Sequence, residues 1–533
     1  MAAGSAVEPM ERGEWRRVSR WSLALVIAML LPYGLGAAMS TPDQRFGGLL
    51  IGLEDQYSYL AKMVQGAHGA WLFQLPYTAT PHPPIFLYTF YLLLGKVSVL
   101  LGLPHVVTYH AARAVLGFIT LLVIYRFIAE FAPDRKVRLL AWGLTALMGG
   151  PGWVAMLAGQ PTLLDSLPLE FIVPEGFTFL MLYTLPHLLL ARSLLLLGAL
   201  GVWRAGQGGS IGRGLIAGGA WLVMSIIQPI YSAVALTLAA LMVLARTIEL
   251  RRLPWRSIGA GALAGACAVP MVLYVMSVFA VDPTYGPWSQ TAITSPGPEL
   301  YAITFGLPLL LALGGARAVL RRRSAGEWFL LLWLAAGPLL VYAPTNAQRR
   351  LIESWQIPLS VMAAIGLWQL IGRWPRARRW LVGLVMALLS MTYVIMIGYH
   401  VAALASRWPP LFQDAGLVKA AEWLDAHASY ADGVLAAYDT STMLPALAGV
   451  RVMTGHPSET IDSPLRRAEV EMFFAEQTTD GWRRDLLARL RLNYVLYGPR
   501  EKQLGSFDPA SAPYFEAVLS ADETTLYRVA VEP

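Results

Sequence analysis

Long apolar runs dominate the chain and constrain its fold more than any other feature. A helix that crosses a bilayer needs about 20 mostly apolar residues, and runs near that length recur along most of the sequence. Hydrophobic residues make up 56% of the 533 residues and charged residues only 14%. We therefore predict an all-α polytopic membrane protein with about eleven spans. The spans are expected at 21–41, 107–131, 139–158, 177–203, 213–228, 230–248, 257–281, 300–319, 328–343, 357–371 and 380–400.

Short basic clusters separate these runs and predict the orientation of the chain. Arg12, Arg16, Arg17 and Arg20 precede the first run, so the positive-inside rule places a tail of residues 1–20 in the cytoplasm. The first run lacks a small-residue cleavage site and is expected to stay as an anchor in the cell membrane. The net charge of +7 lies at the ends of spans, so we expect no nucleic-acid partner. Further clusters lie at 135–138, 204–213, 246–256, 317–323 and 373–379.

Two points of this predicted membrane topology allow more than one interpretation. Residues 85–103 are apolar enough to span, but a crossing there would put the basic cluster at 135–138 outside. We expect a shallow or re-entrant helix in the first external loop, introduced by the stiff His82-Pro83-Pro84 turn. The runs 213–228 and 230–248 are separated only by Gln228-Pro229, so one long helix is the alternative there.

The composition changes after Val401, where charged residues return between short β-rich runs. We expect residues 401–533 to form a small α/β domain outside the membrane, and 21–400 to form the transmembrane domain. The strands are expected at GVLAAY, RVMTG, NYVLYG and TLYRVAV, and helices at 415–427 and 480–492.

The first external loop, residues 42–106, carries two adjacent acids, Glu54 and Asp55, at the head of a predicted interfacial helix. The acids can simply offset the positive end of the helix dipole. Alternatively, because adjacent helical residues point about 100° apart, one acid serves the helix while the other faces a cavity. The apolar face is expected to hold Tyr57, Leu60, Ala61 and Val64, and the face toward water Ser58, Lys62 and Gln65.

This layout resembles the polytopic glycosyltransferases of the GT-C superfamily. The shared features are one span, an external loop that opens with the acidic pair, an aromatic helix, an HPP turn and then Arg113. The protein O-mannosyltransferases and the aminoarabinose transferases of lipid A are similar in layout. The motif match covers residues 20–131, and the rest matches by architecture. The resemblance implies that Asp55 is a catalytic base or metal-linked carboxylate and that Glu54 is its partner.

Transfer of a sugar from a polyprenyl phosphate also needs cations that stabilise the departing phosphate. Arg349 and Arg350 are expected outside, against the general charge bias, and guanidinium groups bind phosphate with two donors each. With Arg113 they form the predicted phosphate-binding set. The alternatives for the pair are contact with lipid headgroups and an ion pair with Glu353.

Further polar residues are candidates for an acceptor cavity. His82 and His110 flank the shallow helix, and His187 lies within a span beside a proline. Glu175 is a second external acid, whereas Asp165 and Glu170 on the same loop are expected to be solvated. The metal requirement is open: a magnesium or manganese ion is conceivable, with Asp55 and Glu175 as candidate ligands. In the C-terminal domain, TGHPSETIDSPLRR resembles a GH-x-x-ET pattern of bacterial superfamily members, and His456 and Glu459 are expected at the acceptor entrance or on a plain surface loop.

The leading hypothesis is a membrane glycosyltransferase that uses a polyprenyl-phosphate sugar, with a lipid, glycan or protein as acceptor and membrane lipids as further partners. A flippase or transporter for lipid-linked sugars is the second hypothesis, but such proteins carry paired repeats and no repeat is evident. A polysaccharide polymerase or ligase is the third, and the acidic first loop argues against it. The sequence leaves the sugar and the acceptor open.

Overall fold

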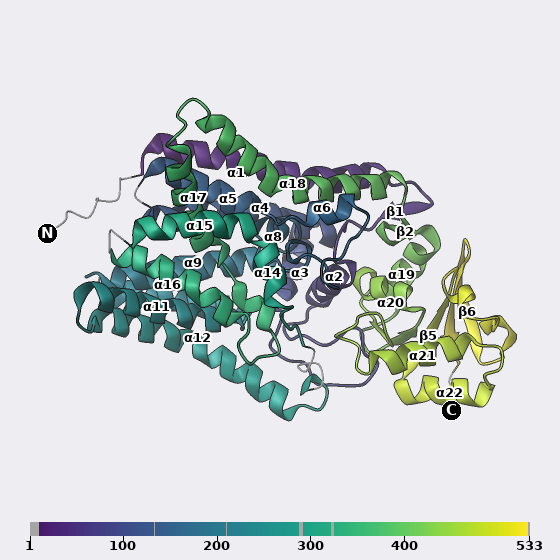
Figure 1. Ribbon diagram of the computed structural model, residues 1–533. Coiled ribbons are helices and arrows are strands. Elements are labelled where there is room, and N and C mark those ends of the chain that lie inside the picture. Colours follow the sequence, from purple (N-terminus) through teal and green to yellow (C-terminus); the bar gives the residue numbers. More distant parts are fainter. Residues whose placement is uncertain (1–9, 133, 209–210, 287–291, 321–323, 531–533) are drawn as a thin grey trace. The chain divides into compact units, whose positions relative to one another are not determined.

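The computed structural model describes residues 10–530 except 133, 209–210, 287–291 and 321–323. Residues 1–9 of the predicted tail and the basic residues 321–323 therefore lie outside the described part. The chain forms two compact units (Figure 1). The helical unit comprises Met1–Leu31, Ala112–Ser277 and Ala292–Tyr399, and the mixed unit comprises Pro32–Ala111, Val278–Thr291 and His400–Pro533.

Four long helices run from one unit into the other. They are α1 (Arg12–Ala38), α4 (His105–Phe131), α12 (Trp255–Val281) and α18 (Arg378–Ala405). The helix α1 begins at Arg12, so the second half of the predicted cytoplasmic tail 1–20 is helical. The other elements of the helical unit are α5 (Arg135–Leu147), α6 (Gly152–Leu157), α7 (Leu169–Ile172), α8 (Thr178–Thr184), α9 (Pro186–Gly206), α10 (Ile211–Ile227), α11 (Tyr231–Leu250), α14 (Pro298–Thr304), α15 (Gly306–Val319), α16 (Ala325–Leu340), η1 (Gln348–Ile352) and α17 (Gln356–Ile371).

Each of the eleven predicted spans contains helix. Within the described residues, seven helical stretches are long and apolar enough to cross a membrane, and an eighth counts if the pair α14 and α15, bent by 80°, is one span. The chain is thus a multi-pass membrane protein, while the full count of eleven crossings stays a prediction. The Gln228-Pro229 break is confirmed, since α10 and α11 are separate helices. The span expected at 177–203 is divided, because Pro186 starts the new helix α9.

The apolar stretch 85–103 forms a short helix in the mixed unit. This helix, α3 (Thr89–Leu101), has 13 residues, so it is about 20 Å long and falls short of a hydrocarbon core of about 30 Å. It packs closely against α2 (Leu53–Ala67), because a Cβ atom on Gly66 or Gly95 would meet backbone of the other helix at about 2 Å. Its length supports the expectation of a helix that does not cross.

The mixed unit is built around a five-stranded sheet in the order β4-β3-β5-β7-β6. The strands β4, β3 and β5 are parallel, and β7 and β6 add antiparallel to β5. The predicted C-terminal strands and both predicted helices are present. The elements are β1 (Gln44–Phe46), η2 (Pro409–Leu411), β2 (Phe412–Asp414), α19 (Ala415–His427), β3 (Gly433–Leu435), α20 (Tyr438–Leu447), β4 (Arg451–Val452), α21 (Ser463–Phe474), α22 (Asp480–Leu490), β5 (Leu492–Tyr497), η3 (Glu501–Gln503), η4 (Pro509–Ser511), β6 (Phe515–Ala521) and β7 (Thr524–Val529).

Alternating strand residues fill two cores, one on each face of the sheet. Val434 and Leu496 belong to a core that includes α19, α20 and α2, whereas Leu435 and Val495 belong to a core with α21 and α22. The short ribbon of β1 and β2 also joins the first loop to the C-terminal residues, with Gln44 opposite Asp414. The first external loop therefore folds together with residues 400–533, a grouping that the predicted domain boundaries did not include.

Candidate active site

The two predicted acids occupy the first turn of α2 and point to different surroundings. Gly52 precedes the helix with a left-handed backbone (φ 60°) that favours glycine. The side chain of Asp55 is 69% exposed, so this carboxylate is open to solvent. Glu54 is half-buried and accepts a hydrogen bond of 2.5 Å from the hydroxyl of Tyr438, the first residue of α20. Burial and the Glu54 charge raise the pKa of Tyr438, which keeps the phenol protonated as a donor.

Asp55 is held by a histidine from the C-terminal region. The Nε2 atom of buried His456 lies 3.3 Å from Oδ1 of Asp55. The other ring nitrogen, Nδ1, accepts the backbone N–H groups of Ser458 (3.2 Å) and Glu459 (3.1 Å). Because an acceptor Nδ1 carries no proton, the ring proton sits on Nε2 and is donated to Asp55. His456 therefore orients the Asp55 carboxylate.

One turn further along α2, a buried polar cluster joins this helix to the same C-terminal loop. The Nζ atom of Lys62 lies 2.7 Å from Oε1 of Glu459, with side chains 0% and 4% exposed. The hydroxyl of Ser58 donates to the same oxygen at 2.7 Å, and Lys62 also bonds this hydroxyl. Ser58, Lys62 and Gln65 were expected to face water, and that prediction was wrong, because the C-terminal loop and the loop segment around Gln74 cover this side of α2.

Aromatic rings surround the lysine of this cluster. The Nζ atom of Lys62 lies 4.1 Å from the centre of the Tyr88 ring and 5.1 Å from that of Phe73. Burial lowers the pKa of Lys62, and the Glu459 charge opposes this shift. Burial alone would raise the pKa of Glu459, but the Lys62 charge and the hydrogen bonds from Lys62 and Ser58 oppose it, and the pKa is lowered. The contact of 2.7 Å between Nζ and Oε1 makes this a buried ion pair.

The predicted arginine pair lies on η1 in the helical unit. The Nε atom of Arg349 is buried and has no hydrogen-bond partner among the described residues. Arg350 is 38% exposed, and its Nε atom is 3.9 Å from Oε1 of buried Glu175. Burial raises the pKa of Glu175, and the Arg350 charge opposes that shift. The cluster thus offers two guanidinium groups against one carboxylate.

The alternative that Glu353 pairs with these arginines does not hold. Glu353 instead forms a buried ion pair with Arg192, with 2.6 Å between Oε1 and Nε. Arg192 also donates to the hydroxyl of Thr178 and to the carbonyl of Glu175, so it ties α9 to the loop that carries Glu175. The sequence analysis did not single out Arg192, although an arginine inside an apolar span is itself a signal for a buried partner.

Arg113 and His187 are both buried in the helical unit. The guanidinium of buried Arg113 donates to the carbonyl oxygens of Leu182 (3.0 Å) and Tyr183 (2.7 Å) at the end of α8. Arg113 therefore bonds carbonyl groups at the end of α8, where the helix stops before Pro186, so we remove it from the predicted phosphate-binding set. His187 is the buried second residue of α9.

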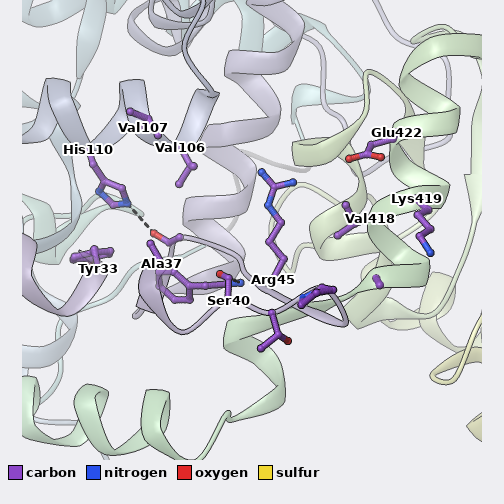
Figure 2. Close-up of a pocket in the computed structure, with 15 residues that line it drawn as sticks. Tyr33, Ala37, Ser40, Arg45, Val106, Val107, His110, Val418, Lys419 and Glu422 are labelled. Carbon is purple, nitrogen blue, oxygen red and sulfur yellow. Dashed lines mark hydrogen bonds between the residues drawn. The ribbon is translucent and has the colours of Figure 1, made fainter. Parts of the chain in front are cut away.

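The two histidines near the shallow helix do not share a cavity. Both ring nitrogens of His82 bond backbone: Nε2 accepts the N–H of Leu75 and Nδ1 donates to the carbonyl of Thr80. Burial lowers the pKa of His82, which keeps it neutral. His110 lines a separate pocket and its Nε2 atom bonds the carbonyl oxygen of Gly48 at 2.7 Å (Figure 2).

The loop before α8 also departs from expectation at one acid. Asp165 is exposed, as predicted. Glu170 was expected to be solvated, but it is fully buried and its Oε1 atom accepts the N–H of Gly152 at 2.7 Å. Burial raises the pKa of Glu170 to about 6. A side chain on Gly152 would collide with this carboxylate, so the MGGPGW turn leaves room for it.

Comparisons with known proteins by sequence and by structure give different results. No family model and no curated protein matches the sequence. Solved structures do match: the mycobacterial arabinofuranosyltransferase AftD, as the R1389S mutant, has 16% identity and a TM-score of 0.56, over 99% of this chain and 42% of that chain. The Archaeoglobus fulgidus oligosaccharyltransferase with a tethered acceptor peptide has 12% identity and a TM-score of 0.51, over 90% and 69%. Both are GT-C glycosyltransferases.

The chain has the GT-C fold. The predicted fold class and the resemblance are thus confirmed at the level of the fold. ArnT from Cupriavidus metallidurans, bound to undecaprenyl phosphate, also matches over 96% of this chain and 98% of that chain, with 13% identity. The TM-score of that match is 0.49. The chain spans less than half of the length of AftD.

The candidate metal ligands, Asp55 and Glu175, lie in different parts of the structure and are not members of a cluster of ligands within its described residues. Among the described residues, no group of three or more His, Cys, Asp or Glu side chains is arranged to hold a metal ion. Asp55 lies beside a histidine that donates to it, and Glu175 lies beside a cation. Magnesium usually keeps several waters and binds only one or two carboxylates together with substrate phosphates. Asp55 and Glu175 therefore stay candidate ligands for a divalent cation, and Asp55 is also a candidate base.

The chemistry available at α2 follows from its contacts. The carboxylate of Asp55 is 69% exposed, so a substrate hydroxyl can reach it while His456 donates a hydrogen bond to it. The Tyr438 hydroxyl donates a hydrogen bond to the carboxylate of Glu54, so the two acids have distinct roles. The sequence did not point to three residues that stabilise the start of α2. Tyr438 bonds Glu54, and Ser58 and Lys62 bond Glu459, which lies on the same loop as His456. Glu54, Ser58 and Lys62 recur every four residues along α2, and this polar stripe was the available signal.

Proposed function

We propose that this chain is a membrane glycosyltransferase that moves a sugar from a polyprenyl-phosphate donor to an acceptor hydroxyl on the extracytoplasmic side. The observation that carries the proposal is the exposed Asp55 carboxylate, oriented by His456 at the start of the first-loop helix of a GT-C fold. The related folds support sugar transfer, since one belongs to an arabinofuranosyltransferase and the other to an oligosaccharyltransferase with an acceptor peptide. Their acceptors differ, so a lipid, a glycan and a protein all remain candidates here.

In the proposed reaction, Asp55 removes the proton of the acceptor hydroxyl. The acceptor oxygen then bonds the anomeric carbon while the bond from that carbon to the phosphate oxygen breaks. The polyprenyl phosphate leaves with the electron pair of that bond, and the proton remains on Asp55 until water removes it. His456 holds the carboxylate in one orientation, which lowers the entropic cost of reaching the reactive geometry.

Arg349 and Arg350 are the proposed partners of the donor phosphate. The buried Nε donor of Arg349 has no bond partner in the described structure, and burial without a partner is costly. Burial also lowers the pKa of this guanidinium, so an anion that binds here regains part of that cost. The neighbouring Glu175 is only loosely paired at 3.9 Å, so a phosphate can compete for Arg350.

The proposal includes an orientation in the membrane. The tail before α1 is cytoplasmic, and the first loop 42–106 and the domain 401–533 are extracytoplasmic. The bond between Ser58 and Glu459 supports this arrangement, because residues that touch in water must lie on the same side of the bilayer. An even number of crossings must then separate the two segments, and the ten expected spans between residues 107 and 400 satisfy this condition.

The experiment is a release assay with the full chain in detergent or nanodiscs. A panel of polyprenyl-phosphate sugars is offered with water or simple alcohols as acceptors, and release of the lipid phosphate is measured. The wild-type chain is expected to release it from at least one donor. Asp55→Asn keeps the shape of the side chain but removes the base, so turnover should fall by about a hundredfold or more while donor binding survives. An Asp55→Asn variant with wild-type turnover would remove Asp55 from the mechanism.

The matched control is Glu54→Gln. Glu54 serves the helix dipole and Tyr438, so this change should cost turnover much less than Asp55→Asn. Equal thermal unfolding midpoints of the two variants would show that the difference lies in the chemistry. If Glu54→Gln is the inactive variant, the base is one residue earlier on α2.

A further inference from the structure

The mixed unit contains a second cavity that the proposed mechanism does not use. Its volume is about 570 Å³, within the range of small-molecule sites, and neither Asp55 nor His456 lines it. Figure 2 shows residues of its walls, which come from the last turns of α1, the first turns of α4, the loop from Ser40 to Gly48 and the first turns of α19. The cavity therefore lies at the ends of two helices that are long and apolar enough to cross a membrane.

The walls of this cavity are amphiphilic. The helices contribute apolar groups, including Ala37 of α1 and Val106 and Val107 of α4, whereas the loop and α19 contribute Arg45 and Glu422. Val107 is 47% exposed, and Leu35 of α1 and Leu103, two residues before α4, are also exposed, which continues the apolar surface along the chain. A ligand with a polar head and an acyl tail matches such a site.

The two charged side chains at the polar end are not neutralised by the protein. Among the described residues, the side chains of Arg45 and Glu422 form no hydrogen bond or ion pair, either with each other or with another residue. Figure 2 shows them on separate walls of the cavity. Lys419, in contrast, is paired with Asp522 at 3.1 Å. The cavity thus presents one available cation and one available anion.

We propose that this cavity binds the headgroup of a zwitterionic glycerophospholipid of the outer leaflet, phosphatidylethanolamine. Its phosphodiester would lie on Arg45 and its ammonium group on Glu422. The first turns of α4 and α19 add partial positive charge on the phosphate side. A polyprenyl phosphate is a poorer match, because a monoester of charge near −2 would meet the Glu422 carboxylate and offers no group for it. The proposal does not depend on the transferase activity.

The test measures lipid binding to the purified full chain by native mass spectrometry. Four lipids with matched acyl chains are compared where the chemistry allows: phosphatidylethanolamine, phosphatidylcholine, phosphatidylglycerol and undecaprenyl phosphate. We expect phosphatidylethanolamine to bind at least about tenfold more tightly than phosphatidylcholine, because only the primary ammonium donates hydrogen bonds to Glu422. A preference for phosphatidylglycerol or undecaprenyl phosphate, or equal binding of all four, would overturn the proposal.

Two variants assign the preference to the cavity. Arg45→Ala should weaken phosphatidylethanolamine and phosphatidylglycerol alike, since both carry the phosphodiester. Glu422→Gln should remove the preference for phosphatidylethanolamine over phosphatidylcholine and leave phosphatidylglycerol unchanged or tighter. Both residues are exposed, so folding should survive and is checked by the unfolding midpoint. Arg484→Ala, an exposed arginine outside the cavity, is the matched control. Wild-type lipid selectivity in both cavity variants would refute the assignment.

Discussion

The buried ion pair between Lys62 and Glu459 gives a prediction whose magnitude follows from the structure. Lys62→Met keeps the volume of the side chain and its contact with the Tyr88 ring but leaves Glu459 buried without its cation. The carboxylate must then either stay charged in an apolar site or take up a proton. Removal of one partner from a buried pair typically costs about 3–5 kcal/mol.

Protonation sets an upper limit on this cost for the glutamate. Its ordinary pKa is 4.5, and each pH unit between the pKa and the working pH costs about 1.36 kcal/mol, so neutralisation at pH 7 costs about 3.4 kcal/mol. Glu459→Gln leaves Lys62 without its anion. Deprotonation of this lysine at pH 7, from its ordinary pKa of 10.5, costs about 4.8 kcal/mol by the same reasoning. The double variant removes both charges, and glutamine still accepts the Ser58 hydroxyl, so it should lie closer to wild type than either single variant.

The assay is thermal unfolding of the full chain, followed by the fluorescence of tryptophans. For a folded unit of 150–250 residues, 1 kcal/mol corresponds to about 2–4 °C, so each single variant should lose roughly 6–20 °C. Acid provides an internal check. In Lys62→Met the pKa of Glu459 is raised above its ordinary value, so the penalty is full at pH 7 and shrinks as the pH falls toward 4.5.

Ser441→Ala is the matched control, because it removes a buried hydroxyl of the same unit that bonds only backbone. Single variants as stable as wild type would refute the reasoning, since they would show that the pair is not desolvated. A double variant less stable than both singles would also refute it, because the loss would then come from packing and not from unpaired charge.

Three further predictions concern other parts of the chain. Arg349→Ala and Arg350→Ala should each weaken donor binding about tenfold or more, with partial rescue by Lys, and Arg376→Ala should not; unchanged donor affinity in both would leave the pair as headgroup anchors. In a chain with Cys267 replaced, a cysteine at Ser429 should react with an impermeant thiol reagent from outside and one at Arg376 should not, and the reverse labelling would overturn the orientation. The stability of the wild-type chain should decrease as the pH falls below 4.5, because the lowered pKa of Glu459 makes the ion pair stabilising only while the carboxylate is charged. An unfolding midpoint that does not change with pH in this range would contradict the shift.

Local patterns in the sequence determined a large part of the fold. Apolar runs of about 20 residues, breaks such as Gln228-Pro229 and the β-rich runs after Val401 report on nearest neighbours along the chain, and the corresponding helices and strands are present. The acidic pair at the head of the first-loop helix was visible for the same reason, because a helix start is a local event. These signals were sufficient for the fold class and for the position of Asp55.

Only the tertiary structure decided what surrounds that carboxylate. His456 reaches Asp55 across 401 positions of sequence, and Glu459 reaches Lys62 across 397. Helical periodicity correctly found the apolar face of α2, but it assigned Ser58 and Lys62 to water because no local pattern shows that a distant loop covers them. The buried ammonium group of Lys62 is stabilised by a partner of opposite charge, and the folding of the C-terminal region onto the first loop supplies that partner, Glu459.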